Sequence, residues 1–337
     1  MDPLTKTSMP RIPKTETSPV PSNAVRVRVS LKEKETQELV IGDKTLTLSG
    51  KAFEGDLCSF YLGTYSAPKV IKSGVVKPHP SRFDRILEDS GAEDTTRILL
   101  KVTNSALDTD LLDNEIKTLD FLSKDEGEIL KYLPKSYNLP HLDGIFIGIQ
   151  QAHILEYCEG YVSLAEVIKA YPKGIDFRDA AWMLRRILEG ITYVHDKGVV
   201  HGALLPPHIL IHPTEHSAKI IDWSYAVQRG KIRALCSDYV KWYPPEVIRS
   251  VDATKTIDLY MIAKMAMALL GGDPLSNTMP IEVPSHLQEL LLSCVKEDIN
   301  RRPKEAVGVY KSLSQVLETL VGKPKYRPFS MPKEDTK

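Results

Sequence analysis

The chain has 337 residues, of which 42% are hydrophobic and 26% charged, as in ordinary soluble globular proteins. Lys plus Arg and Asp plus Glu both number 44, so the formal net charge is zero. This balance argues against a general nucleic-acid binder, which usually carries a basic excess. The four cysteines form no Cys-x-x-Cys pair, which argues against a zinc ribbon or a disulfide scaffold and fits a reducing cytoplasm. No apolar stretch predicts a signal peptide or a membrane span.

The first half of the chain is predicted to be rich in strands. Residues 1–40 carry many Pro, Ser, Thr and Lys and are predicted to be a disordered tail. The stretches LVIGDKTLTLSG, CSFYLGTY and RILLKV have strand patterns, and the polar segment 66–96 is predicted to be an inserted loop. Apolar positions of helical spacing predict a helix over 108–122, and FIGIQQAHILEY predicts one or two more strands.

The second half is predicted to be mainly helical. Ser163 and Glu166 have the spacing of a capping box, and the segment 177–197 has a helical apolar period that Gly198 closes. Short strands are expected near 209–211 and 219–221, and three further helices are expected at 258–270, 284–296 and 304–321. A strand-rich half followed by a helix-rich half predicts an α+β protein of two lobes with a cleft between them.

Five landmarks occur in order in this second half. His201 opens the stretch HGALLPPHILIH, Asp222 follows 21 residues later in KIIDWS, and Glu246 comes 24 residues after that in YPPE. Asp258 lies in TIDLYMIA and Arg302 in NRRP. These stretches resemble the catalytic loop, the metal-binding loop, the Ala-Pro-Glu segment, a buried helix aspartate and the arginine that pairs with the glutamate in protein kinases.

The resemblance covers roughly residues 40–322 and implies a bilobal kinase-like fold. It implies a small antiparallel strand-rich N-lobe over 41–156, a larger helical C-lobe over 157–323 and a C-terminal tail over 324–337. In GDLCSFY, HGALLPPHILIHP, WYPPEV and RPFSMP the chain also resembles a group of bacterial kinase-like domains.

The resemblance further implies a nucleotide site. Lys101 in ILLKV resembles the lysine that contacts ATP phosphates, and Glu115 lies 14 residues later as its ion-pair partner. Asp222 would hold one Mg²⁺ ion, and the alternative is that it simply caps a turn. Likewise, Lys101 could be an ordinary exposed strand lysine.

Backbone groups complete this implied site. Glu156 and Cys158 in LEYCEG resemble the hinge that binds adenine. Gly50 and Gly55 in SGKAFEGDLC are the candidates for a degraded glycine-rich loop over the phosphates. Glu246 and Arg302 are expected to form a structural ion pair, and Asp258 is expected to bind backbone near His201.

The catalytic loop departs from the kinase pattern His-Arg-Asp-Leu-Lys-Pro-x-Asn. Gly202 replaces the arginine, Ala203 the aspartate, Leu205 the lysine and His208 the asparagine. The aspartate orients the substrate hydroxyl, which the methyl group of Ala203 cannot do. The asparagine gives a hard oxygen to magnesium, whereas the imidazole of His208 offers nitrogen. We therefore assign no residue of this loop a catalytic role, His201, Ala203 and His208 included.

The leading interpretation is an ATP-binding pseudokinase with a regulatory or interaction role and a protein client. The alternatives are an active, non-standard serine/threonine protein kinase and a scaffold that binds no nucleotide, which the eroded glycine loop favours. A small-molecule kinase is less favoured because Asp258 and Arg302 fit protein kinases. A zinc site at the clustered histidines is rejected because prolines interrupt the helix it would need. No nucleic-acid or membrane partner is expected.

Overall fold

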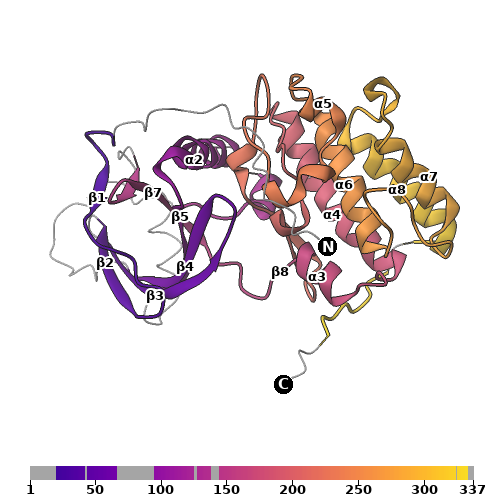
Figure 1. Cartoon of the computed structure of the whole chain (residues 1–337). Helices are drawn as coiled ribbons and strands as arrows, with labels where there is room; N and C mark the ends of the chain where they lie inside the picture. Colours follow the sequence, from indigo (N-terminus) through magenta and orange to yellow (C-terminus); the bar gives the residue numbers. More distant parts are fainter. Residues whose placement is uncertain are drawn as a thin grey trace, which may run out of the picture. The chain divides into compact units, whose positions relative to one another are not determined.

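The computed structural model describes residues 20–41, 44–66, 95–124, 127–137, 144–323 and 325–332. They fall into two compact units, which are described separately (Figure 1). The strand unit takes its residues from 20–113 and 135–157, and the helical unit takes its residues from 114–134 and 158–332. The expected insertion 66–96 lies outside the described residues except at its two ends, which belong to strands.

The strand unit is built on one seven-stranded sheet in the order β1-β6-β7-β5-β4-β3-β2. Neighbouring strands are antiparallel except β1 and β6, which are parallel. The strands are β1 (Val25–Val27), β2 (Gln37–Ile41), β3 (Lys44–Glu54), β4 (Cys58–Ser66), β5 (Thr95–Thr103), β6 (Ile145–Ile147) and β7 (Gln150–Glu156).

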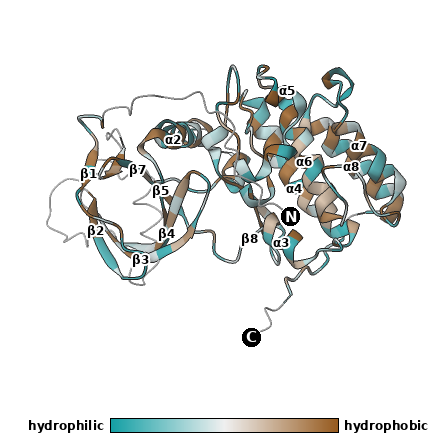
Figure 2. Ribbon diagram, in the orientation of Figure 1, coloured by the Kyte–Doolittle hydropathy of each residue, from teal (hydrophilic) through white to brown (hydrophobic). Residues whose placement is uncertain are grey.

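Alternation of apolar and polar residues explains these strands. Leu39 and Ile41 of β2 and Leu46 and Leu48 of β3 are buried, with more exposed residues between them. Apolar and hydrophilic residues are interleaved in the elements of both units (Figure 2). The single strand expected over LVIGDKTLTLSG is two strands, which pair with each other from Gln37 opposite Leu48 to Ile41 opposite Lys44.

The expectation of a disordered tail over 1–40 is wrong for its second half. Residues 1–19 lie outside the described part of the chain, but β1 and most of β2 fall within 20–40. Val27 and Leu39 are buried in the core of the sheet. The average composition of the segment hid a short alternation of valine and arginine that begins at Val25.

The helical unit contains most of the helices and a small second sheet. That sheet has the order β10-β9-β8, all antiparallel, and consists of β8 (Val162–Ser163), β9 (Ile209–His212) and β10 (Ser217–Ile220). Helix α2 begins in the strand unit and ends in the helical unit. The helices are α2 (Thr109–Ser123), α3 (Leu164–Ala170), α4 (Phe177–Asp196), α5 (Pro245–Ile248), α6 (Lys255–Leu269), α7 (Ser285–Cys294) and α8 (Ala306–Val321).

Two helices organise the core of the helical unit. Helix α4 is amphipathic, begins at the N-cap Asp176 and gives way to Gly198, whose φ of 72° suits glycine. Helix α6 is buried around its whole circumference, which is typical of a helix enclosed by other elements. The capping box of Ser163 and Glu166 is present at the start of α3. The strand-rich first part and the helical second part confirm the α+β fold class.

Glu246 of α5 and Arg302 form a buried ion pair in the helical unit. The guanidinium donates to both carboxylate oxygens, with Nη1 to Oε1 at 2.5 Å and Nη2 to Oε2 at 3.1 Å. Arg302 also donates to the carbonyls of Lys296 and Glu297 and lies over the ring of Tyr260. The pair therefore joins α5 to α6 and to the segment that precedes α8.

We expect Arg302→Met to lower the free energy of unfolding by about 3–5 kcal/mol, because it leaves the Glu246 carboxylate buried without its counter-charge. Urea denaturation measures this loss. The double variant Glu246→Leu/Arg302→Met buries no charge and should recover part of it. A double variant no more stable than Arg302→Met would contradict the electrostatic explanation.

Candidate functional site

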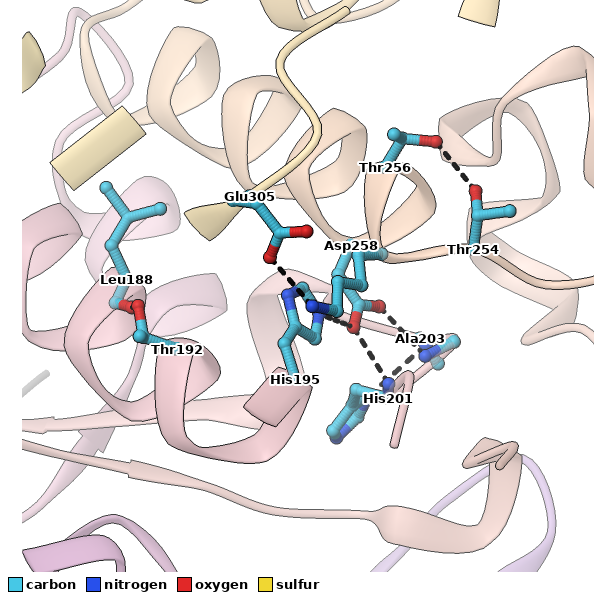
Figure 3. Close-up of polar contacts among 11 residues, drawn as sticks. Leu188, Thr192, His195, His201, Ala203, Thr254, Thr256, Asp258 and Glu305 are labelled. Carbon is cyan, nitrogen blue, oxygen red and sulfur yellow. Dashed lines mark hydrogen bonds and ion pairs between the residues drawn. The ribbon is translucent and has the colours of Figure 1, made fainter. Parts of the chain in front are cut away.

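The carboxylate of Asp258 on α6 fixes the backbone at 201–202 (Figure 3). Its Oδ2 accepts from the backbone N–H of His201 at 2.8 Å, and its Oδ1 accepts from that of Gly202 at 2.9 Å. His195 Nε2, at the end of α4, lies 2.9 Å from Oδ2. Asp258 is fully buried, so these three donors replace its water shell. The sequence analysis expected Asp258 to bind backbone near His201, and these are the hydrogen bonds that do so.

The backbone conformation and close packing at position 202 favour glycine there. Its φ is 76°, and a Cβ there would lie 2.7 Å from the carbonyl oxygen of Tyr225. The backbone of 200 and 227 is also joined by reciprocal hydrogen bonds of 2.8 Å. A larger residue at 202, such as the arginine of the kinase pattern, requires this neighbouring strand-like segment to move.

His201 is held as a neutral imidazole. Its Nε2 donates to the carbonyl of Ile221 at 3.0 Å, and its Nδ1 accepts from the backbone N–H of Ala203 at 3.3 Å. The ring also meets the indole of Trp223 edge to face, with centroids 4.6 Å apart. Burial lowers the pKa of His201 to about 4, although the Asp258 carboxylate opposes that shift.

This lowered pKa predicts a limb in the pH dependence of stability. Between pH 6.5 and about 4 the unfolded chain binds a proton at His201 that the folded chain does not, so the free energy of unfolding falls as the pH falls. The fall attributable to this group is about 3 kcal/mol, from ~1.4 kcal/mol per pKa unit.

Urea denaturation at several pH values, compared between the wild type and His201→Phe, isolates this limb because both proteins share the same carboxylates. Parallel pH profiles for the two proteins would show that His201 titrates as it does in the unfolded chain.

His208 and Asp222 lie together where the kinase pattern has an asparagine and an aspartate. His208 Nε2 is 3.2 Å from Asp222 Oδ2, and His208 Nδ1 donates to the carbonyl of Ala203 at 2.8 Å. The Nδ1 contact requires a proton on that nitrogen, because a carbonyl oxygen only accepts. Asp222 itself has φ 60° and ψ 65°, a left-handed conformation that turns the chain after β10.

The oxygen donors at this position suit one magnesium ion at most. Magnesium prefers oxygen ligands and is usually bound by one or two carboxylates together with phosphates. Asp222 offers a carboxylate, whereas His208 offers nitrogen, a poor ligand for this ion. In the described residues no group of three or more His, Cys, Asp or Glu side chains is arranged to hold a metal. A magnesium ion at Asp222 would compete with the His208 contact.

The rest of the loop is apolar. Ala203 and Leu205, at the aspartate and lysine positions of the pattern, are both fully buried. Neither side chain can move a proton or hold charge. Of the groups that the kinase pattern places in the loop 201–208 and in the metal-binding loop, the helical unit therefore retains the carboxylate of Asp222.

Two residues of α2 bind the segment after Asp222. Glu115 Oε2 accepts from the hydroxyl of Ser224 at 3.0 Å, and the Asn114 amide donates to the carbonyls of Ser224 at 3.1 Å and Ala226 at 2.9 Å. Ser224 stands where the kinase pattern has glycine, and its hydroxyl binds the carboxylate of Glu115. Sequence reasoning missed Asn114, whose only signal is its position next to Glu115.

Lys101 lies on β5 of the strand unit and is buried, with 2% of its surface exposed. Its ammonium is 5.8 Å from the centroid of the Phe60 ring, and Phe60 stacks on Phe53 at 4.4 Å. The alternative of an ordinary exposed lysine is therefore wrong. The ion pair of Lys101 with Glu115 stays a prediction, since the two residues belong to different units.

The candidate glycines of the strand unit serve the packing of the chain itself. Gly50 has φ 113°, and a Cβ there would lie 2.8 Å from the carbonyl oxygen of Glu33, which accepts from Lys51 N–H. Gly55 begins the turn between β3 and β4: its N–H donates to Cys58, and its carbonyl accepts from the Asn104 side chain. Both glycines thus have uses that require no phosphate.

The two expected hinge residues have backbone partners of their own. Glu156 N–H donates to the carbonyl of Lys135 at 2.9 Å, and the Glu156 carboxylate accepts from Lys135 N–H at 3.0 Å, all within the strand unit. In the helical unit the carbonyl of Cys158 accepts from Tyr161 N–H at 3.3 Å. Their contact with adenine stays a prediction.

The protein kinase domain family matches residues 113–323, which is more than half of the chain. The chain therefore belongs to the protein kinase domain family. This agrees with the resemblance drawn from the landmarks at 201, 222, 246, 258 and 302 and with the bilobal α+β class.

Individual kinases show the same relation at low identity. Aurora kinase B of Mus musculus is 27% identical over 196 residues, 57% of this chain and 54% of that protein. Cell division control protein 7 of Schizosaccharomyces pombe is 30% identical over 172 residues, 45% of this chain and 16% of that protein. Mitogen-activated protein kinase kinase kinase dlk-1 of Caenorhabditis elegans is 28% identical over 171 residues, 44% of this chain and 18% of that protein. The chain thus spans about half of the first of these proteins and less than a fifth of the other two.

Proposed function

We propose that the chain is a pseudokinase that binds ATP and acts on a protein client by interaction. The observation that carries the proposal is the fully buried methyl group of Ala203 at the position of the kinase aspartate. That aspartate accepts or orients the proton of the substrate hydroxyl, and no other carboxylate stands in for it in the loop 201–208.

The charge around the transferring phosphoryl group is also reduced. Leu205 cannot supply the positive charge of the lysine in the kinase pattern, and His208 is directed at Asp222. Phosphoryl transfer depends on positioning and charge neutralisation, so the loss of three groups in one loop removes most of what the C-lobe contributes.

The binding half of the proposal depends on Lys101 and Asp222. Lys101 would contact the phosphates of ATP, and Asp222 would hold one magnesium ion that neutralises them. Lys101 on β5 is buried and its ammonium lies near the ring of Phe60 on β4. Both observations support a fixed role for the Lys101 side chain. The lobe boundaries 41–156 and 157–323, the bacterial relationship and a cytoplasmic location are part of the same proposal. Across the described residues no helix is both long and apolar enough to cross a membrane.

Nucleotide binding predicts thermal stabilisation by ATP. A ligand at 100 times its Kd adds about 2.7 kcal/mol to the free energy of unfolding. We expect this shift in the wild type and in Lys231→Met, which removes an exposed loop lysine, and its loss in Lys101→Met.

Because His208 competes with the metal, His208→Asn should make the shift depend more strongly on magnesium. An unchanged melting temperature at millimolar ATP would favour the nucleotide-free scaffold, which the structural uses of Gly50 and Gly55 support.

The pseudokinase proposal predicts no phosphoryl transfer. Incubation of the pure chain and a mixed protein substrate with γ-labelled ATP and Mg²⁺ or Mn²⁺ should leave both unlabelled. Labelling that disappears in Asp222→Ala and is unchanged in Ala203→Asp would instead establish the active, non-standard kinase.

A further inference from the structure

Residues 325–332, here called the C-terminal strap, lie beyond the part of the chain that matches the kinase family. The strap has neither helix nor strand, yet it is attached to the helical unit by side chains at three points. The expected tail over 324–337 contains the buried Phe329.

The first attachment is electrostatic. Arg327 Nε and Nη2 donate to the two carboxylate oxygens of Asp179 at 3.2 and 3.1 Å, and Nη1 lies 3.5 Å from Asp176. Asp176 is the N-cap of α4 and Asp179 is in its first turn, where the helix dipole favours negative charge. A planar guanidinium that binds a carboxylate through two hydrogen bonds selects arginine over lysine.

The second attachment is a stack of three rings. His216, in the turn between β9 and β10, stacks on Trp182 of α4 with centroids 4.1 Å apart and planes 4° apart. The ring of Tyr326 also contacts this imidazole, with centroids 4.7 Å apart and planes tilted by 32°, and its hydroxyl donates to the carbonyl of Thr214 at 3.2 Å. Burial lowers the pKa of His216, so the stacked imidazole is uncharged near neutral pH.

The third attachment is the packing of Phe329 against two aromatic rings. Its ring is 9% exposed and packs against Tyr171, just after α3, at 5.9 Å and against Trp182 at 6.4 Å. The hydroxyl of Tyr171 donates to the carbonyl of Ser330. Pro328, between Arg327 and Phe329, has a restricted φ and so reduces the conformational entropy lost when both neighbours dock.

The strap is held mainly through its own side chains. The described strap residues take part in none of the backbone–backbone hydrogen bonds that join turns and loops, so their attachment does not extend a sheet or a helix. The surface contacts Tyr326, Arg327 and Phe329, which are the second, third and fifth residues of the strap. Trp182 Nε1 and His216 Nε2 are buried and have no partner among the described residues, so the strap leaves hydrogen-bonding capacity of its site unused.

We propose that the start of α4, the end of α3 and the β9–β10 turn form a peptide-docking site, and that residues 325–332 are its intramolecular ligand. The strap detaches and docks as a unit while the helical unit stays folded, because its attachments are partly exposed side-chain contacts. None of the contacts described for the strap involves a residue assigned to the nucleotide site.

The test uses the full chain with its site vacated. In the double variant Arg327→Ala/Phe329→Ala, a fluorescent synthetic peptide with the sequence of residues 325–332 should bind at least tenfold more tightly than it binds the wild type, as measured by fluorescence anisotropy. The wild-type strap competes with the peptide at the high effective concentration of a tethered ligand. Adding Asp179→Asn should weaken this binding at least tenfold, whereas adding Asp252→Asn, a change at an exposed aspartate, should not.

A second measurement does not depend on the vacated variant. Arg327→Glu and Asp179→Arg should each speed cleavage of the folded chain by chymotrypsin after Phe329, and the combined charge exchange should restore resistance. Peptide binding that ignores Asp179→Asn, absence of binding to a folded vacated chain, or cleavage of the strap only on global unfolding would overturn the proposal and make the strap a permanent part of the fold.

Discussion

The buried carboxylate of Asp258 is the interaction on which the central loops of the helical unit depend. An uncompensated charge inside a protein is costly, so Asp258 is stable only with its three donors in place. Two of these donors are consecutive backbone N–H groups, which sets the direction of the chain at 201–202. His201 can then donate to Ile221, which leads directly to Asp222. One helix residue thus orders two loops, and it does so although these loops have lost the residues that kinases use for transfer.

The order in this region does not depend on the loop positions that carry phosphoryl-transfer residues in the kinase pattern. Glu246 with Arg302 and Asp258 with the 201–202 backbone hold the framework, and neither interaction involves Ala203, Leu205 or His208. His208 Nε2 instead contacts the carboxylate of Asp222, the group proposed to hold a magnesium ion. The proposed interaction role would use surfaces of this framework, and the proposed strap site would be one of them.

Much of this was predictable from sequence, for identifiable reasons. The period of α4 and the order of Asp222, Glu246, Asp258 and Arg302 are local patterns, and they were sufficient for the family and the fold class. Contacts between a side chain and distant backbone leave no such pattern, which is why Asn114 was missed. Averaged composition also misled at the N-terminal end, where it concealed β1 in a proline-rich segment. Gly50 was correctly picked as unusual, but its partner is the backbone of Glu33.

The close approach of the Tyr225 carbonyl to Gly202 has an evolutionary consequence. Any side chain at 202 collides with this oxygen at a backbone conformation that already disfavours it. In a lineage with glycine at 202 the two segments can approach until no side chain fits, and arginine can then return only together with a shift of the facing segment. Position 202 and the segment around Tyr225 are therefore expected to change together in sequence.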